Sequence, residues 1–107
     1  MATDPRFRMI VEDVFGIRGR GTIVTGCIGQ GSLEAGDEIE LRGPGYTRAV
    51  VVVAIEKSRK RVDRAVEGDY VGLKLEGVGT EEVQTGDVLS GERRGGERWG
   101  LDGAEQW

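Results

Sequence analysis

Glycine is the feature that most restricts the fold of this chain, because 19 of its 107 residues are glycine. A glycine inside a helix costs about 1 kcal/mol relative to alanine, so glycines at such frequent intervals argue against long helices. Short apolar runs lie between them with the alternation that is typical of strands. In Glu38–Arg42, for example, Ile39 and Leu41 point one way and charged side chains point the other. The sequence therefore predicts short β-strands joined by tight turns.

Six segments have this strand character. Gly, Pro and Asp mark reversals of the chain at Glu34–Glu38, Arg42–Tyr46 and Val66–Tyr70. The run Ala49–Ile55 is β-branched towards both faces, so we expect a central strand that is covered on both sides. The predicted strands are Phe7–Phe15, Thr22–Ile28, Glu38–Arg42, Thr47–Ile55, Tyr70–Glu76 and Asp87–Ser90.

Helical character is confined to one stretch, Thr80–Thr85, with Thr80 as the expected N-cap and acidic residues near the positive end of the helix dipole. Short strands without intervening helices indicate an all-β fold, a small closed barrel rather than an α/β protein. We expect an N-terminal extension over residues 1–6 and the barrel over residues 7–91. A Gly-rich charged tail over residues 92–107 is expected to be disordered.

Composition excludes several kinds of catalytic site. Cys27 is the single cysteine and the chain has no histidine, so an intrachain disulfide is excluded. A Ser-His-Asp triad, a Cys-His pair and a His-ligated zinc site are excluded for the same reason. The acidic residues show no spacing that identifies a catalytic pair of carboxylates. We therefore expect a protein that is not an enzyme and that holds no metal and no cofactor.

Positive charge is concentrated locally, although the net charge of −4 argues against a basic nucleic-acid-binding domain. The run between Lys57 and Arg64 is interpreted either as a solvated loop between strands or as a phosphate contact. No apolar run approaches the roughly 20 residues that span a bilayer, so we expect no membrane contact and a cytoplasmic protein. The candidate phosphate contacts in this run are Lys57, Arg59, Lys60, Arg61 and Arg64.

The segment Val11–Gly26 places arginines and glycines between two apolar runs, as some phosphate-binding loops do. A P-loop needs a lysine and a Ser/Thr after its second glycine, but Thr22 and Ile23 follow Gly21 here. A dinucleotide fingerprint also fails, because no glycine lies three residues after Gly21 and no helix-forming run follows. With no Asn-Lys-x-Asp base-reading motif either, we expect no binding of GTP.

This chain closely resembles domain II of elongation factor Tu and of related translational GTPases in two long runs, VEDVFGIRGRGTIVTGCIGQGSLEAGDEIEL and EKSRKRVDRAVEGDYVGLKLEGVGTEEVQTGDVLSG. The resemblance covers about Phe7 to Gly91. It implies a six-stranded antiparallel β-barrel, in agreement with the strand pattern. Because the family's GTPase domain is missing from the sequence, we expect domain II to occur here as a stand-alone domain.

The resemblance also implies contact with the aminoacylated 3′ adenosine of tRNA and with ribosomal RNA of the small subunit. In the family the adenine lies in a shallow apolar slot closed by a glutamate, beside a pocket for the esterified amino acid. The matching positions here are Ile17, Gly19, Ile23 and Glu82 for the slot, Glu12, Asp13, Phe15 and Thr25 for the pocket, and Arg20, in the GRGT turn, for a phosphate contact.

Other functions are compatible with the same sequence. The barrel face, or Trp99 and Trp107 in the tail, could engage a protein partner in an interaction or scaffold module. An accessory barrel of the flavin-reductase type shares the gross topology. The favoured expectation is a binding module that contacts RNA or the ribosome weakly, and the main alternative is a module that binds another protein.

Overall fold

The structure is a computed structural model, and it describes residues 6–17 and 21–91. Within these residues there is no α-helix, so the predicted all-β class is confirmed. The predicted tail and the first five residues lie outside the described part. The elements are β1 (Arg8–Ile10), β2 (Asp13–Ile17), β3 (Gly21–Gln30), β4 (Ser32–Glu34), β5 (Glu38–Gly43), β6 (Tyr46–Lys57), β7 (Lys60–Val62), β8 (Arg64–Val66), β9 (Tyr70–Glu76), the short 3₁₀ helix η1 (Thr80–Glu82) and β10 (Val88–Ser90).

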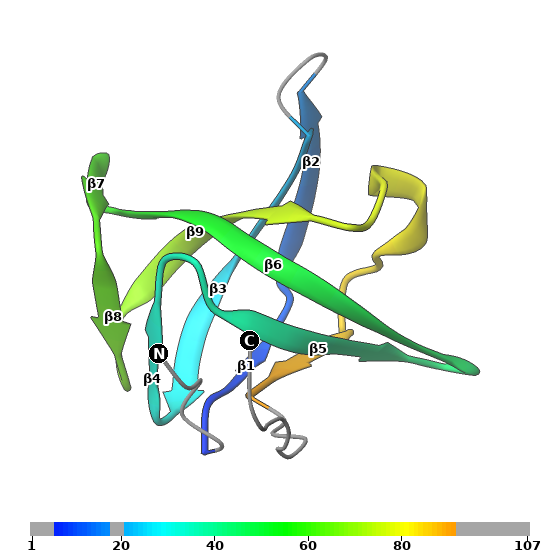
Figure 1. Ribbon diagram of the computed structural model, residues 1–107, viewed down its shortest axis with the longest axis horizontal. Helices are drawn as coiled ribbons and strands as arrows, with labels where there is room; N and C mark the ends of the chain where they lie inside the picture. Colours follow the sequence, from blue (N-terminus) through cyan, green and yellow to red (C-terminus); the bar gives the residue numbers. More distant parts are fainter. Residues whose placement is uncertain (1–5, 18–20, 92–107) are drawn as a thin grey trace, which may run out of the picture.

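Six strands form a closed ring in the order β1-β10-β5-β6-β9-β3, and β1 pairs again with β3 to complete it (Figure 1). Every one of these pairings is antiparallel. Strand β2 extends the sheet beyond the ring by pairing with β3, and β7 pairs with the far end of β6. Strands β4 and β8 form a separate two-stranded sheet. The predicted closed six-stranded antiparallel barrel is confirmed.

Strand alternation fills the interior of the ring. In β9, whose bounds match the prediction, Val71, Leu73 and Leu75 are buried, and Gly72 and Lys74 between them face outward. Burying one such aliphatic side chain is worth about 1.5–3 kcal/mol, so the shared core is the main source of stability. The largest fully buried side chains come from all parts of the barrel, and they include Phe7, Met9, Ile28, Leu33, Leu41, Ile55, Leu73, Leu75 and Leu89.

The predicted first strand, Phe7–Phe15, is two strands. The Val11 N–H donates to the carbonyl of Asp87 and the Val11 carbonyl accepts from the Gly86 N–H, both at 2.8 Å. These bonds hold Val11 to the turn before β10, whereas the Glu12 N–H donates to the Thr25 carbonyl on β3 at 2.8 Å. The chain therefore divides here, with β1 in the ring and β2 paired with β3.

Strand β6 is central, as predicted, but it is covered on one face only. Its pairing with β9 shifts between Val52 and Ala54, which is a β-bulge at Val53. Val52 and Ile55 are buried, whereas Val53 is 36% exposed. The extra residue reverses the alternation, so Ala54 and Glu56 face outward and not into the core.

The helical turn is shorter than predicted, and its N-cap is Gly79 and not Thr80. Thr80 is the first residue of η1, and the Gly79 N–H donates to Oε1 of Glu82 at 2.7 Å. The next residue, Val83, is buried and has extended backbone angles (φ −124°, ψ 138°), which end the turn.

Three connections share one turn with the pattern x-x-Gly-Asp. In each, the aspartate carboxylate accepts the N–H of the residue three positions earlier, and the glycine has a positive φ that L-residues avoid. The three turns are Glu34–Asp37 (2.9 Å, φ 98° at Gly36), Val66–Asp69 (3.0 Å, φ 94° at Gly68) and Gln84–Asp87 (3.0 Å, φ 97° at Gly86).

A substitution of Gly68 tests whether these turns need glycine for its backbone freedom. No atom lies within 4 Å of the position that a Cβ would take at Gly68, so the effect of alanine comes from the φ of 94° alone. We expect Gly68→Ala to lower the free energy of unfolding by about 1–2 kcal/mol. At Gly72 the φ angle is ordinary, and a Cβ would lie 3.9 Å from its nearest neighbour, Thr25 Cγ2. Gly72→Ala should therefore change the free energy of unfolding by less than about 0.5 kcal/mol. Equal effects of the two variants in urea unfolding would contradict this explanation.

The charge on Asp69 makes stability depend on pH. Its carboxylate accepts the Val66 N–H at 3.0 Å and lies 2.9 Å from Lys57 Nζ, and these contacts lower the pKa of Asp69 below 3.8. A lowered native pKa contributes stability that is present above the unfolded value and lost as the pH falls through the native one. We expect the stability difference between wild type and Asp69→Asn to be constant near neutral pH and to shrink below pH 3.8.

Urea unfolding at several pH values measures this difference. Asp63→Asn is the control, because it makes the same substitution at an aspartate that is exposed. A difference for Asp69→Asn that grows on acidification would overturn the expectation.

Candidate functional site

An open groove of about 160 Å³ lies on the outer surface of the barrel, across β3, β9, β6 and β7. One wall is a row of cross-strand neighbours: Ile23 on β3 lies opposite Lys74 on β9, which lies opposite Ala54 on β6. The Lys74 side chain runs towards the start of β3, where its Cε is 3.9 Å from the position of a Cβ on Gly21. This wall therefore has two apolar side chains, with the lysine between them in the row.

The floor and the other wall come from the neighbouring row. Gly72 on β9 leaves the floor open because it has no side chain, and it lies opposite Glu56 on β6. Glu56 in turn lies opposite Arg61 on β7. Among the described residues, no ion pair joins Glu56 to Arg61 or to Lys74. The groove thus presents one carboxylate acceptor and two cationic donors to a ligand.

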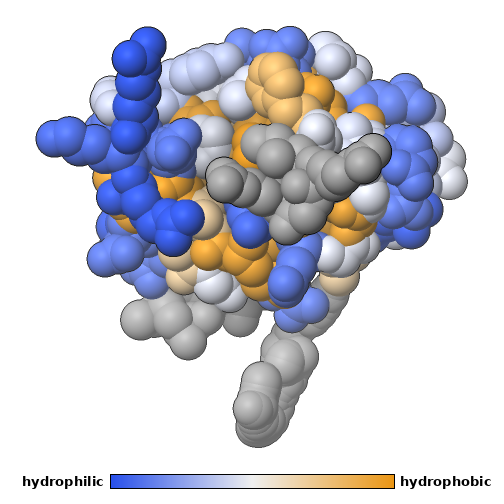
Figure 2. Space-filling model, turned by 90° about the horizontal axis from the view of Figure 1, so that it is seen from above, coloured by the Kyte–Doolittle hydropathy of each residue, from blue (hydrophilic) through white to orange (hydrophobic). Residues whose placement is uncertain are grey.

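The basic run that starts at Lys57 forms a β-hairpin beside the groove. One interpretation of the sequence had been a solvated loop. Lys57 pairs with Lys60 across a two-residue turn, Ser58-Arg59, whose φ values of 53° and 67° are those of a type I′ turn. Figure 2 shows long hydrophilic side chains projecting on the left, the side where Figure 1 places β7, with apolar surface next to them. The run from Lys57 to Arg61 is therefore an ordered projection and not an irregular loop.

The predicted phosphate contacts fall into two groups. Lys57 and Arg64 have acidic partners, Asp69 at 2.9 Å and Glu34 at 3.3 Å. Three further cations have no ion pair with the described part of the chain and are exposed, namely Arg59, Lys60 and Arg61. The second group is the one that is available to an anionic ligand.

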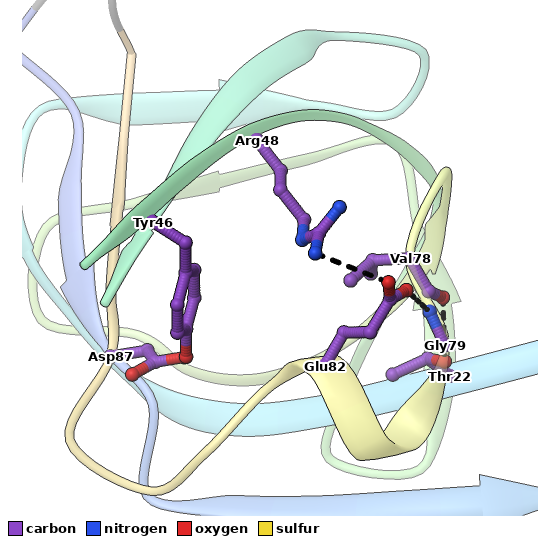
Figure 3. Close-up of polar contacts among 7 residues, drawn as sticks. All are labelled: Thr22, Tyr46, Arg48, Val78, Gly79, Glu82 and Asp87. Carbon is purple, nitrogen blue, oxygen red and sulfur yellow. Dashed lines mark hydrogen bonds and ion pairs between the residues drawn. The ribbon is translucent and has the colours of Figure 1, made fainter. Parts of the chain in front are cut away.

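Glu82, the predicted closing carboxylate, lies elsewhere (Figure 3). Its Oε1 accepts the Gly79 N–H at 2.7 Å and its Oε2 is 3.2 Å from Arg48 Nη2, so both oxygens are engaged within the protein. The segment that carries it packs on one face of the β2–β3 hairpin, where Thr22 Oγ1 donates to the Val78 carbonyl at 2.9 Å. Ile23, the next residue along β3, faces the opposite way. The structure does not bring Glu82 and Ile23 together.

Tyr46 lies near the segment that carries Glu82, and it contacts Asp87 and Arg48 (Figure 3). The Tyr46 hydroxyl donates to the buried carboxylate of Asp87, and this hydrogen bond, more than any other influence, raises the pKa of Tyr46 above 10.0. Arg48 lies over the Tyr46 ring, 6.0 Å from its centre. These contacts join β6 to the turn before β10, and none of the three residues lines the groove across β3, β9, β6 and β7.

Three of the four residues predicted for the aminoacyl side, Asp13, Phe15 and Thr25, lie on one face of the β2–β3 pair. Phe15 on β2 lies opposite Ile23 and is 50% exposed, and Asp13 lies opposite Thr25. Glu12, just before β2, is exposed. The Tyr70 hydroxyl donates to Thr25 Oγ1 at 3.3 Å, so β9 contributes to this surface as well.

Part of the predicted slot lies outside the described residues. Gly19 and Arg20 belong to the segment that the structure leaves out, and the backbone of Ile17 pairs with Gly21 at the end of β2.

Sequence reasoning missed Glu56, Gly72 and Lys74 as site residues. The alternation of β9 was the one signal available for two of them, because it placed Gly72 and Lys74 on the outer face.

Residues 6–17 and 21–91 contain no cluster of potential metal ligands and no membrane-spanning helix. In this part of the chain, no three His, Cys, Asp or Glu side chains are grouped so that they could hold a metal ion. Nor does any helix there have the length and apolar character needed to cross a membrane.

Comparison with known proteins agrees with the barrel. A family model described as elongation factor Tu domain 2 matches residues 21–90. The crystal structure of translation elongation factor SelB from Methanococcus maripaludis, in its apo form, matches with a TM-score of 0.74 and 31% sequence identity over 81% of this chain. The chain spans 19% of that SelB chain. This chain belongs to the elongation factor Tu domain 2 family, the β-barrel domain of translation factors.

Proposed function

We propose that this chain is a non-enzymatic binding module that contacts single-stranded RNA, such as the 3′ end of a tRNA or an exposed segment of ribosomal RNA. Membership of a translation-factor domain family supports an RNA partner. The observation that carries the proposal is the groove, which combines an apolar wall, a free carboxylate and cationic donors on one outward surface.

The groove suits a nucleobase. The flat face of a base would pack on Ile23 over the open floor at Gly72, and Glu56 would accept a hydrogen bond from an exocyclic amino group. Stacking on an aromatic side chain is worth about 1–3 kcal/mol per base, and an aliphatic wall lies at the low end of that range. In this proposal Glu56 takes the role that the family resemblance implied for Glu82.

The basic hairpin suits the RNA backbone. Arg59 and Lys60 project beside the groove and would contact phosphates of the nucleotides next to the bound base. Lys57 and Arg64 would add less, because acidic partners already neutralise them. Arg20 belongs to the same proposal as a further phosphate contact. With one base and a few phosphates bound, we expect a high-micromolar to millimolar Kd, about 4–6 kcal/mol of binding free energy.

The pocket for an esterified amino acid remains part of the proposal. Phe15, Asp13 and Thr25 lie on the same outward surface as Ile23, so a group attached to the bound nucleotide would meet them.

Two matched glutamate variants test the groove against the predicted slot. In titrations with a short RNA that ends in CCA, followed by amide chemical shifts, we expect the largest changes at Ile23, Glu56 and Gly72. Glu56→Gln should weaken binding about threefold to tenfold, because it replaces a charged acceptor by a neutral one. Glu82→Gln removes the same charge but should leave binding unchanged.

If Glu82→Gln weakened RNA binding and Glu56→Gln did not, Glu82 and not Glu56 would be the carboxylate that contacts the base. If no amide chemical shift changes at millimolar RNA, the proposal of RNA binding is wrong.

A second candidate function, binding of a protein partner, is favoured by two exposed aromatic side chains. Phe15 is 50% and Tyr70 is 53% exposed, and they flank β3 on the same outer face. If this surface docks a protein, the double variant Phe15→Ala/Tyr70→Ala should lose a partner that wild type captures from lysate, while Ile10→Ala, which removes an equally exposed side chain on β1, should retain it. Equal capture by both variants would contradict this candidate.

A further inference from the structure

We infer that the free edge of β2 binds an extended peptide of another protein, which adds to the sheet as an antiparallel strand with a lysine or arginine opposite Asp13. This inference does not depend on RNA binding, because no residue of β2 lines the groove. It assigns a role to the backbone of Val14 and Gly16, which neither the motif pattern nor the family match picks out.

Strand β2 is the outermost strand of the main sheet, and it extends beyond the ring at the top of Figure 1. It pairs with β3 alone, in a register that runs without a shift from Asp13 to Ile17. Among the described residues, no backbone hydrogen bond joins β2 to any segment other than β3. Within this part of the chain, the side of β2 away from β3 is therefore an open edge.

The hydrogen bonds of β3 show which of its residues bond to β2. The Ile28 N–H donates to the carbonyl of Asp69 and the Ile28 carbonyl accepts from the Gly68 N–H, both at 2.9 Å, so these groups of Ile28 point towards β9. The direction alternates along a strand, and the pairing of β3 with β9 has no shift in its register. The backbone groups of Thr25 and Ile23 therefore point the other way, towards β2.

The same alternation identifies the groups at the open edge of β2. Asp13 and Phe15 are the partners of those two β3 residues, so their N–H and C=O groups point to β3. The N–H and C=O groups of Val14 and Gly16 then point to the open edge. Val14 is half-buried and Gly16 is exposed. Two donors and two acceptors are thus arranged as an added strand requires.

Strand β2 lacks the usual protection of an edge. Natural edge strands are kept from pairing with other chains by lysines, prolines, bulges or very short length. Strand β7, which also has a single partner strand, is three residues long and has Lys60 and Arg61 exposed. Strand β2 has five residues, with neither lysine nor proline among them, and Asp13 is its one charged residue.

This charge favours a basic partner. An antiparallel strand bonded at Val14 and Gly16 would bring its side chains closest to those of Asp13 and Phe15, which are both exposed. No ion pair joins Asp13 or its neighbour Glu12 to another described residue. A lysine or arginine would supply the cation, and an aromatic residue would pack on Phe15. Because β2 contains no lysine or arginine, the strand of a second copy would leave the charge of Asp13 unbalanced.

A capped hexapeptide, valine-threonine-tyrosine-threonine-lysine-threonine, tests strand addition. Antiparallel to β2, its tyrosine lies opposite Phe15 and its lysine opposite Asp13, so the N–H groups of the two threonines beside the tyrosine donate to β2. N-methylation of these two nitrogens should weaken binding at least about tenfold in amide-shift titrations of the wild-type chain. N-methylation of the tyrosine and lysine nitrogens, which face away from β2, is the matched control and should leave binding unchanged.

Variants of the chain test the same contacts from the other side. Val14→Pro removes an N–H at the open edge and should abolish binding, whereas Val14→Ala shortens the same side chain, keeps the N–H and should retain binding. Replacing the lysine of the peptide by glutamate should weaken binding to wild type about threefold to tenfold, and should weaken binding to Asp13→Asn by less. If Val14→Pro does not fold, the N-methylated peptides still test the edge on the wild-type chain.

Three results would overturn the inference. Equal affinities for the two N-methylated peptides would show that the peptide does not bind as a strand. Equal affinities for the lysine and glutamate peptides would remove the basic partner. If the amides of Val14 and Gly16 became protected from exchange as the concentration of the chain alone rises, the edge would belong to a second copy. The titration with CCA-ending RNA tests the proposed function separately from all three.

Discussion

The barrel depends on one close contact, the approach of the N-terminal segment to β3 that closes the ring. A Cβ on Gly26 would lie 2.5 Å from the Ile10 carbonyl oxygen and 2.9 Å from Met9 Cε, so any other residue would force the strands apart. At Gly31, which has a positive φ of 71°, it would lie 2.6 Å from the Phe7 nitrogen. Because β1 can lie against β3 here, both edges of the six-stranded ring are paired and its interior is sealed.

The sealed ring determines where binding can occur. Its interior is packed with aliphatic side chains, so a ligand can only meet the outward faces of the strands. The bulge at Val53 shapes one of those faces, because it turns Ala54 and Glu56 outward next to Lys74. One extra residue in β6 thus brings a carboxylate into the groove that regular alternation would have placed in the core.

The fold could be predicted from the amino-acid sequence, but the groove could not. Alternation in segments such as Tyr70–Glu76 predicted the strands and the closed barrel, since burial on one face leaves a direct trace in the sequence. The groove depends on register among β3, β9, β6 and β7, and a shift of one residue would present the opposite faces. The sequence could not show that both oxygens of Glu82 are engaged for a related reason, because its partners Gly79 and Arg48 are brought to it only by the turn and the sheet.

The type I′ turn at Ser58-Arg59 has a consequence for the stability of the hairpin that carries it. Both residues adopt left-handed backbone conformations, which Asn and Gly adopt with less strain. A replacement by Asn-Gly would relieve that strain and stabilise the hairpin, but it would also delete the cation at its tip. Under the proposed function, Arg59 supplies a phosphate contact at a position where Gly would give a more stable hairpin.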